Sequence, residues 1–185
     1  YKSFKIDTDA EITLEANPDD LTLEKIQQLK HSPVNRLSIG VQSFRDEDLK
    51  FMNRAHTAIE ALNSIKMAQD QGFQNITIDL IYGTPGMSNE DWRYNLRKSF
   101  ALNLPHISSY ALTVEEKTPL HYQILKKNIS PVGEQQSADQ FKILMDEMLR
   151  NGYEQYEISN FCKGNSYSKH NTSYWKKDHY LGCLL

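Results

Sequence analysis

The sequence has few cysteines and no long apolar run. Its 185 residues contain two cysteines, Cys162 and Cys183. Their separation fits neither a disulfide framework nor a common zinc pattern, so we expect two reduced and unlinked thiols. No apolar stretch approaches the roughly 18 residues that a membrane-spanning helix needs, and no charged-then-apolar leader opens the chain. We therefore predict a cytoplasmic chain that is not transmembrane.

Blocks of charge of one sign are also missing. The net charge is -3, and the charged residues, 24% of the chain, are a mixture of acidic and basic residues interspersed along its whole length. Binding to a nucleic-acid backbone usually requires a clustered basic face. We therefore expect no nucleic-acid partner. The length is sufficient for one globular domain, or for one domain with part of a second.

Short β-rich runs and amphipathic helical patterns alternate through the first half of the chain. Strands are predicted at residues 11–16, 36–42, 75–82 and 106–112. Residues 22–31 have a helical pattern, and the capping-box pairs Thr57 with Glu60 and Ser88 with Asp91 predict two more helices. Strands separated by helices are typical of parallel βα units. About four units are too few to close a barrel, so the predicted fold class is α/β, with a partial (β/α) barrel or an open sheet.

The pattern changes after the fourth predicted strand. Residues 134–150 predict one long helix, residues 153–161 predict a strand, and residues 162–173 are polar and turn-rich, which predicts a loop. We place a boundary near residue 120. It divides a βα region, residues 1–120, from residues 121–185, which begin an α+β region.

Four polar residues stand in or near the ends of the predicted strands. Glu15, Gln42 and Asp79 belong to the first, second and third strands, and Arg54 follows Gln42 by one short helix. Ligand sites gather at the carboxyl ends of parallel strands. Here two carboxylates can accept hydrogen bonds from ribose hydroxyls and an amino group, while Arg54 contacts a ligand carboxylate. A structural alternative stays open, in which the strand carboxylates are paired in the core, Arg54 is a surface charge and Gln42 is a turn residue.

Longer motifs are more specific than these patterns. The run RLSIGVQSFRDEDLKFMNRAHT at residues 36–57, followed by ITIDLIYGTPG at residues 76–86, resembles the oxygen-independent coproporphyrinogen III oxidase family of radical S-adenosylmethionine (SAM) proteins. YEQYEISNF at residues 153–161 and KHNTSYW at residues 169–175 resemble the heme-chaperone branch of that family. The resemblance covers the chain from about Glu11 to Gly182. It implies a (β/α)6 partial barrel, of which the predicted strands are the third to sixth.

The resemblance also implies cofactors. It assigns SAM contacts to Glu15, Gln42, Arg54 and Asp79. It further implies a [4Fe–4S] cluster on a CxxxCxxC run and a GGGTP-type turn, and this sequence contains neither. We therefore expect the chain to be a fragment of a longer protein. Alone it should be unable to form the 5′-deoxyadenosyl radical, because it offers no metal ligands to the cluster, and its catalytic residues are unassigned.

A second cofactor is implied by the HNTSYW run at residues 170–175. A similar pattern is linked with heme binding in the heme-chaperone branch. His170 is therefore a candidate axial ligand of heme iron, and Tyr174 and Trp175 are candidates for packing on the macrocycle. The structural alternative is a solvated loop histidine beside two loop aromatics.

Three functions stay open. The first is a heme-binding chaperone that uses SAM and passes heme to a respiratory protein. The second is a true oxidase that converts propionates of a porphyrinogen to vinyl groups, and the third is a non-catalytic βα-barrel module that binds a partner protein. HNTSYW favours the first. An exposed parallel edge strand would also favour a homodimer.

Overall fold

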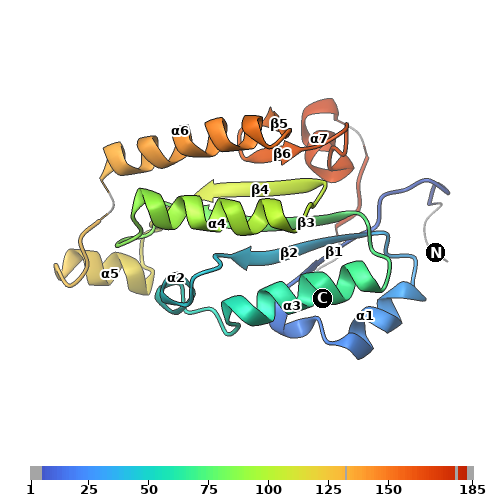
Figure 1. Ribbon diagram of the computed structural model, residues 1–185, viewed down its shortest axis with the longest axis horizontal. Helices are drawn as coiled ribbons and strands as arrows, with labels where there is room; N and C mark the ends of the chain where they lie inside the picture. The colour runs from blue at the N-terminus through green and yellow to red at the C-terminus, as the bar shows by residue number, and fades with distance from the viewer. Residues whose placement is uncertain (1–5, 132, 178, 183–185) are drawn as a thin grey trace.

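The computed structural model describes residues 6–131, 133–177 and 179–182 (Figure 1). At its centre is a six-stranded sheet with the strand order β1-β2-β3-β4-β6-β5. The first four strands are parallel, whereas β6 runs antiparallel to both β4 and β5. The strands are β1 (Thr13–Ala16), β2 (Arg36–Gln42), β3 (Ile76–Tyr82), β4 (His106–Ala111), β5 (Glu154–Glu157) and β6 (Asn160–Cys162).

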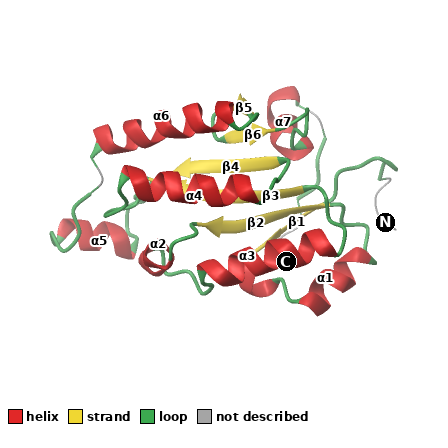
Figure 2. Ribbon diagram, in the orientation of Figure 1, coloured by secondary structure: helices red, strands yellow, loops and turns green. Residues whose placement is uncertain are grey.

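Helices alternate with the parallel strands, as the sequence predicts (Figure 2). Both predicted capping boxes are confirmed: Thr57 with Glu60 opens α3, and Ser88 with Asp91 opens α4. The long helix α6 has the predicted bounds. The helices are the short 3-10 turn η1 (Pro18–Asp20), α1 (Leu23–Lys30), α2 (Asp46–Phe51), α3 (Ala58–Asp70), α4 (Asn89–Ala101), α5 (Pro119–Leu125), α6 (Glu134–Arg150) and α7 (Lys169–Lys176).

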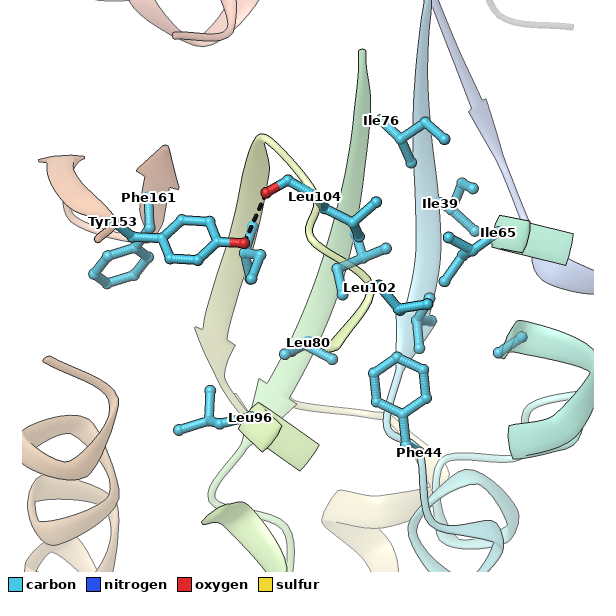
Figure 3. Close-up of a cluster of buried hydrophobic side chains, with 14 of the residues drawn as sticks. Ile39, Phe44, Ile65, Ile76, Leu80, Leu96, Leu102, Leu104, Tyr153 and Phe161 are labelled. Carbon is cyan, nitrogen blue, oxygen red and sulfur yellow. Dashed lines mark hydrogen bonds between the residues drawn. The ribbon is translucent and has the colours of Figure 1, made fainter. Parts of the chain in front are cut away.

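One face of the sheet is apolar and covered by helices. In Figures 1 and 2, α3, α4 and α6 lie on the same side of the sheet. Ile39 and Leu80 of the strands pack here with Ile65 of α3 and Leu96 of α4, and all four are fully buried (Figure 3). Full burial of one such side chain contributes about 1.5–3 kcal/mol. This face therefore holds the core that stabilises the sheet.

The core also extends under the antiparallel strands. Tyr153 and Phe161 are buried beside Leu104, and the Tyr153 hydroxyl donates to the Leu104 carbonyl oxygen at 2.7 Å (Figure 3). Trp92 of α4 is fully buried and donates its Nε1 hydrogen to the carbonyl oxygen of Gln140 in α6 at 3.0 Å. These bonds satisfy the polar ends of two large buried aromatics. They join the C-terminal strands and α6 to the parallel sheet.

The opposite face of the sheet is polar. Side chains alternate between the two faces of a strand, so the residues between the core positions point away from the helices. Those residues are Arg36, Ser38, Gly40, Thr77, Asp79, Ile81, His106, Ser108 and Tyr110, of which only Ile81 has a large apolar side chain. Helix α7 lies on this face, because its Asn171 Nδ2 donates to Asn160 Oδ1 at 3.0 Å and its cap Ser168 donates N–H to the Tyr156 hydroxyl at 3.2 Å.

Two predictions for the C-terminal region are wrong. The strand predicted at residues 153–161 is a hairpin of β5 and β6, because the chain turns at Ile158 and Ser159, and Gln155 Nε2 donates to the Ile158 carbonyl oxygen at 3.0 Å. The loop predicted at residues 162–173 gives way to α7, whose first turn is closed by Ser168 Oγ accepting from the Asn171 N–H at 3.2 Å. A polar eight-residue helix has too little apolar periodicity to stand out in the sequence.

Other predictions concern the chain as a whole. The four parallel strands lie where predicted, with ends shifted by one or two residues. The sheet continues from β4 to β6, and the boundary near residue 120 stays a prediction. Cys162 is a buried free thiol, whereas Cys183 lies outside the described residues. In the part of the chain that the structure describes, no helix combines the length and apolarity needed to cross a bilayer.

Candidate functional site on the polar face

Gln42 and Arg54 meet over Gly40 in the middle of the polar face. A Cβ atom at Gly40 would stand 2.8 Å from Gln42 Nε2 and 3.3 Å from Arg54 Nη2. Arg54 Nη2 also donates to Asn17 Oδ1 at 2.5 Å and to the Gly40 carbonyl oxygen at 3.3 Å. Gln42 has a φ of 65°, a left-handed conformation that is uncommon outside glycine. The absent side chain at Gly40 therefore leaves the space in which an amide and a guanidinium converge.

Asp79 lies on the adjacent strand β3. Burial is the largest effect and raises the pKa of Asp79 to about 6. The Ser108 hydroxyl and the Arg36 and Arg54 guanidiniums lower this pKa, and the charge of Glu15 raises it. Glu15 and Arg54 are therefore near enough to act on Asp79 through space. A partly desolvated carboxylate of this kind gains from a ligand that donates hydrogen bonds to it. The structure thus brings Gln42 and Arg54 together, while Glu15 and Asp79 stand on β1 and β3, the two neighbours of β2.

Helix α7 carries the residues predicted to bind heme on the same face. The His170 ring meets the rings of Tyr174 and Tyr180 edge to face, with centroids 5.2 Å and 5.1 Å away. The Tyr174 hydroxyl lies 3.4 Å from His170 Nε2. Tyr174 and Trp175 are 57% and 70% exposed, which leaves their rings open to a flat partner. An imidazole among exposed aromatics suits a macrocycle that carries a metal.

The two groups of residues lie near each other. A hydrogen bond with Tyr180 raises the pKa of Tyr174, and the charge of Glu15 raises it further. Burial raises the pKa of Tyr110 in β4, and the charges of Asp79 and Glu15 add to this effect. A hollow of about 250 Å³ lies beside α7, lined by Tyr110, Glu157, Asn160, Asn171, Tyr174 and Trp175. Of the predicted ligand-binding residues, Tyr174 and Trp175 line this hollow, whereas Glu15, Gln42, Arg54 and Asp79 do not.

A larger hollow lies on the helix-covered side, among α2, α3 and α4. Its volume is about 620 Å³. Its arginines are already paired with its acidic residues: Arg45 Nε lies 3.3 Å from Asp91, and Arg97 Nη2 lies 2.8 Å from Glu90. Paired surface charges of this kind offer little to a ligand. The smaller hollow on the polar face is therefore the better candidate site.

A buried polar network on the polar face was missed by sequence reasoning. Arg36 Nη2 donates to Thr77 Oγ1 at 2.5 Å, Thr77 Oγ1 lies 3.1 Å from His106 Nδ1, and His106 Nε2 lies 2.6 Å from the Tyr156 hydroxyl. Burial lowers the pKa of His106 to about 3, so the ring is neutral. The signal in the sequence was the alternation of polar and apolar residues along three of the predicted strands. This network is joined to the start of α7, because the Tyr156 hydroxyl accepts a hydrogen bond from the N–H of the cap residue Ser168.

The described residues do not fit an iron–sulfur cluster. Cys162 is buried in β6, and burial raises its pKa to about 11, whereas a cluster ligand must be a thiolate. Across residues 6–131, 133–177 and 179–182, no three His, Cys, Asp or Glu side chains are placed to hold a metal ion. The polar face, in contrast, offers groups that suit SAM: the Gln42 amide and the Arg54 guanidinium meet over Gly40, and the Asp79 carboxyl lies on the adjacent strand β3.

Curated relatives carry the names heme chaperone or radical S-adenosyl methionine domain-containing protein. Heme chaperone HemW of Bacillus subtilis (strain 168) is 39% identical over 173 residues, which are 94% of this chain and 46% of that protein. Radical S-adenosyl methionine domain-containing protein 1, mitochondrial, of Dictyostelium discoideum is 41% identical over 94% of this chain and 41% of its own length. The chain thus spans less than half the length of these relatives. The predicted resemblance to the HemN/HemW type is confirmed.

Solved structures and a family model agree on the fold. Coproporphyrinogen III oxidase (HemN) from Escherichia coli, a radical SAM enzyme, matches 95% of this chain and 40% of its own with a TM-score of 0.75 and 24% identity. Elp3 of Methanocaldococcus infernus matches 75% of this chain with a TM-score of 0.65. These likenesses confirm the predicted partial (β/α) barrel. Residues 2–98, just over half of the chain, match the Radical SAM superfamily. The chain therefore belongs to the radical SAM superfamily, and its similar relatives there are of the HemN/HemW type.

Proposed function

We propose that this chain is part of a heme-binding chaperone in which SAM and heme occupy the same polar face of the sheet. The observation that carries the proposal is the position of α7. Its His170, Tyr174 and Trp175 share the polar face with Glu15 and Asp79, and Glu15 is near enough to act on Tyr174. The name heme chaperone on similar relatives from two bacteria supports the same function.

In this proposal SAM is held by Glu15, Gln42, Arg54 and Asp79. Arg54 and Gln42 donate hydrogen bonds to the SAM carboxylate, while Glu15 and Asp79 accept from its ammonium group and ribose hydroxyls. When SAM is bound beside a reduced cluster, the pair supplies radical chemistry. The residues of this chain bind and orient SAM, and the cluster ligands belong elsewhere in the protein.

Heme is held by α7. His170 Nε2 coordinates the iron in place of its long contact of 3.4 Å with the Tyr174 hydroxyl. Tyr174 and Trp175 pack on the macrocycle, since their exposed rings lose apolar surface to it. The proposal includes a respiratory heme protein as the recipient, a cytoplasmic location and, for the isolated chain, a homodimer in which a second copy covers the edge of β1.

Hemin titration of the full-length protein tests the proposal. We expect wild type to give a sharpened Soret band, His170→Ala to lose it, and His179→Ala to keep it. His179 is the matched control because it is an exposed histidine just beyond α7. Coordination by one imidazole sets the ligand field of the iron, whereas apolar adsorption does not depend on a particular ring. Equal spectra in wild type and His170→Ala would contradict heme ligation by α7.

The oxidase is the second candidate, because HemN has the same fold. It predicts that the reduced full-length protein consumes coproporphyrinogen III in the presence of SAM. Turnover of coproporphyrinogen III, together with an unchanged Soret band in His170→Ala, would favour the oxidase over the chaperone.

A further inference from the structure

A row of polar side chains crosses the polar face from Asp79 to α7, and hydrogen bonds join its members from Ser108 onward. Asp79 and Ser108 are partners in the register of β3 and β4, and a hydrogen bond from Ser108 lowers the pKa of Asp79 against the larger effect of burial. Ser108 Oγ also donates to Asn160 Oδ1 at 2.8 Å. Asn171 Nδ2 donates to the same oxygen at 3.0 Å. Asn171 directly follows His170, so this row of polar side chains ends beside the predicted heme ligand.

Asn160 is held in one orientation at the centre of this row. Its side-chain Nδ2 donates to the Glu157 carboxylate, so its Oδ1 must face Ser108 and Asn171. Ser108 and Asn160 are 2% and 4% exposed, and water therefore cannot easily replace either bond. If one of these hydrogen bonds is lost, water does not replace it, and the next side chain must change its position or its hydrogen bonding.

Ser108 has one hydroxyl hydrogen, which it donates to Asn160 Oδ1, and the Asp79 carboxylate on the partner strand is a second group that can accept it. An ionised carboxylate without a ligand is the stronger acceptor and draws the hydrogen to itself. Two oxygens 2.8 Å apart, Ser108 Oγ and Asn160 Oδ1, then face each other without a hydrogen and repel. When ligand hydroxyl or ammonium groups donate to Asp79, the hydrogen can turn to Asn160, which stabilises its contact with Asn171.

We propose that Asp79, Ser108, Asn160 and Asn171 form a relay that couples SAM binding at Asp79 to the seating of α7, with Asn160 as the positioning residue. The relay rests on the proposed function, because that proposal names SAM as the ligand of Asp79 and heme as the ligand of α7. Its consequence is that bound SAM favours the α7 position in which His170 and Trp175 meet the macrocycle.

Tryptophan fluorescence of the full-length protein reports the α7 position. Trp175 lies on α7 and is 70% exposed, whereas Trp92 is fully buried on the helix-covered face. Saturating SAM, added without reductant, should change the acrylamide quenching of wild type. Trp175→Phe should remove that change, which assigns the signal to α7.

Two variants break the relay at different bonds. Ser108→Ala removes the shared hydrogen, and Asn171→Asp keeps the size of the side chain but places an oxygen where Nδ2 donates. Both should still bind SAM by calorimetry and lose most of the quenching change at saturating SAM. Thr172→Ala is the matched control on α7, because its hydroxyl bonds only to the backbone of Ser168 and Lys169. It should respond as wild type does.

Hemin affinity gives a second readout. Saturating SAM should raise the hemin affinity of wild type about threefold to tenfold, as expected from one net hydrogen bond, and should leave that of Asn171→Asp unchanged. A full quenching response in both Ser108→Ala and Asn171→Asp would overturn the relay. A wild-type protein that binds no SAM would overturn the proposed function, and the relay with it.

Discussion

The two faces of the sheet differ in what alternate residues of the same strands do. In β3, Ile78 and Leu80 are fully buried against the helices, whereas Asp79 between them belongs to the polar face. The first kind of residue removes apolar surface from water, and the second keeps charge and hydrogen-bonding capacity on the polar face. Neighbouring residues of one strand therefore have different roles: one stabilises the core, and the next is available for binding on the polar face. A substitution at one face should change unfolding, and at the other it should change binding or pH dependence.

The largest effect is expected on the helix-covered face. Ile78→Ala should lower the free energy of unfolding by about 2–5 kcal/mol, because it leaves a cavity in a core that cannot fully close. Denaturant titration measures this loss. Ile59→Ala is the control, since Ile59 is 60% exposed on α3 and should cost within about 0.5 kcal/mol. A cost below about 1 kcal/mol for Ile78→Ala would contradict the assignment of the core to this face.

On the polar face, His106 should make the fold sensitive to acid. Its pKa of about 3 lies below the ordinary value of 6.5, so the unfolded chain binds more protons between these values. The stabilising contribution of neutral His106 is therefore present above pH 6.5 and is lost as the pH falls toward 3, by about 2–4 kcal/mol. His106→Gln, which keeps polar atoms but does not titrate, should flatten this part of the pH dependence. An equally steep loss in the variant would contradict the assignment.

Asp79 should have the opposite effect on the pH dependence of stability. Its pKa is raised from 3.8 to about 6, so the folded chain binds more protons than the unfolded chain between these values. Stability should therefore decrease as the pH rises from about 4 to 6. Asp79→Asn should raise the free energy of unfolding by about 1–3 kcal/mol at pH 7.5, with little gain at pH 4. The same variant should bind SAM more weakly, and a variant neither more stable nor weaker in binding would place Asp79 outside the site.

The smallest effect is expected for Arg54, which we propose contacts SAM and which lies outside the buried core. Arg54→Ala should weaken SAM binding by about 1–2 kcal/mol, because a charged hydrogen bond is lost, and should leave stability nearly unchanged. Calorimetric titration compares it with Arg97→Ala on the helix-covered face, where the side chain pairs with Glu90. Equal affinities in the two variants would remove Arg54 from the SAM site.

The sequence predicted the elements whose signals are local. The capping boxes at Thr57 and Ser88, the helix over residues 134–150 and the four parallel strands follow from nearest-neighbour chemistry and periodicity. Glu15, Gln42, Arg54 and Asp79 were predicted as site residues because they lie in or near the ends of predicted strands, which meet at one edge in a parallel sheet, and their role in binding SAM stays a prediction.

The features that the sequence did not predict depend on contacts between distant residues. Ser108 meets Asn160 across 52 positions, and α7 packs on the polar face through bonds that no local pattern specifies. The hairpin turn at Ile158 and Ser159 lacks the glycine or asparagine–glycine signal of a tight turn. Contacts between distant residues therefore determine the β5–β6 hairpin and α7, and the local sequence pattern does not reveal them.

Tyrosine acetylation of the full-length protein, with and without hemin, tests most directly whether ligands bind to the polar face. Tyr110 on the polar face and Tyr94 of α4 on the helix-covered face are a matched pair, 43% and 37% exposed. N-acetylimidazole should modify both in the free protein, and mass spectrometry locates the acetyl groups. We predict that hemin protects Tyr110 and Tyr174 and leaves Tyr94 as reactive as before. Protection of Tyr94 with unchanged reactivity of Tyr110 and Tyr174 would contradict the account.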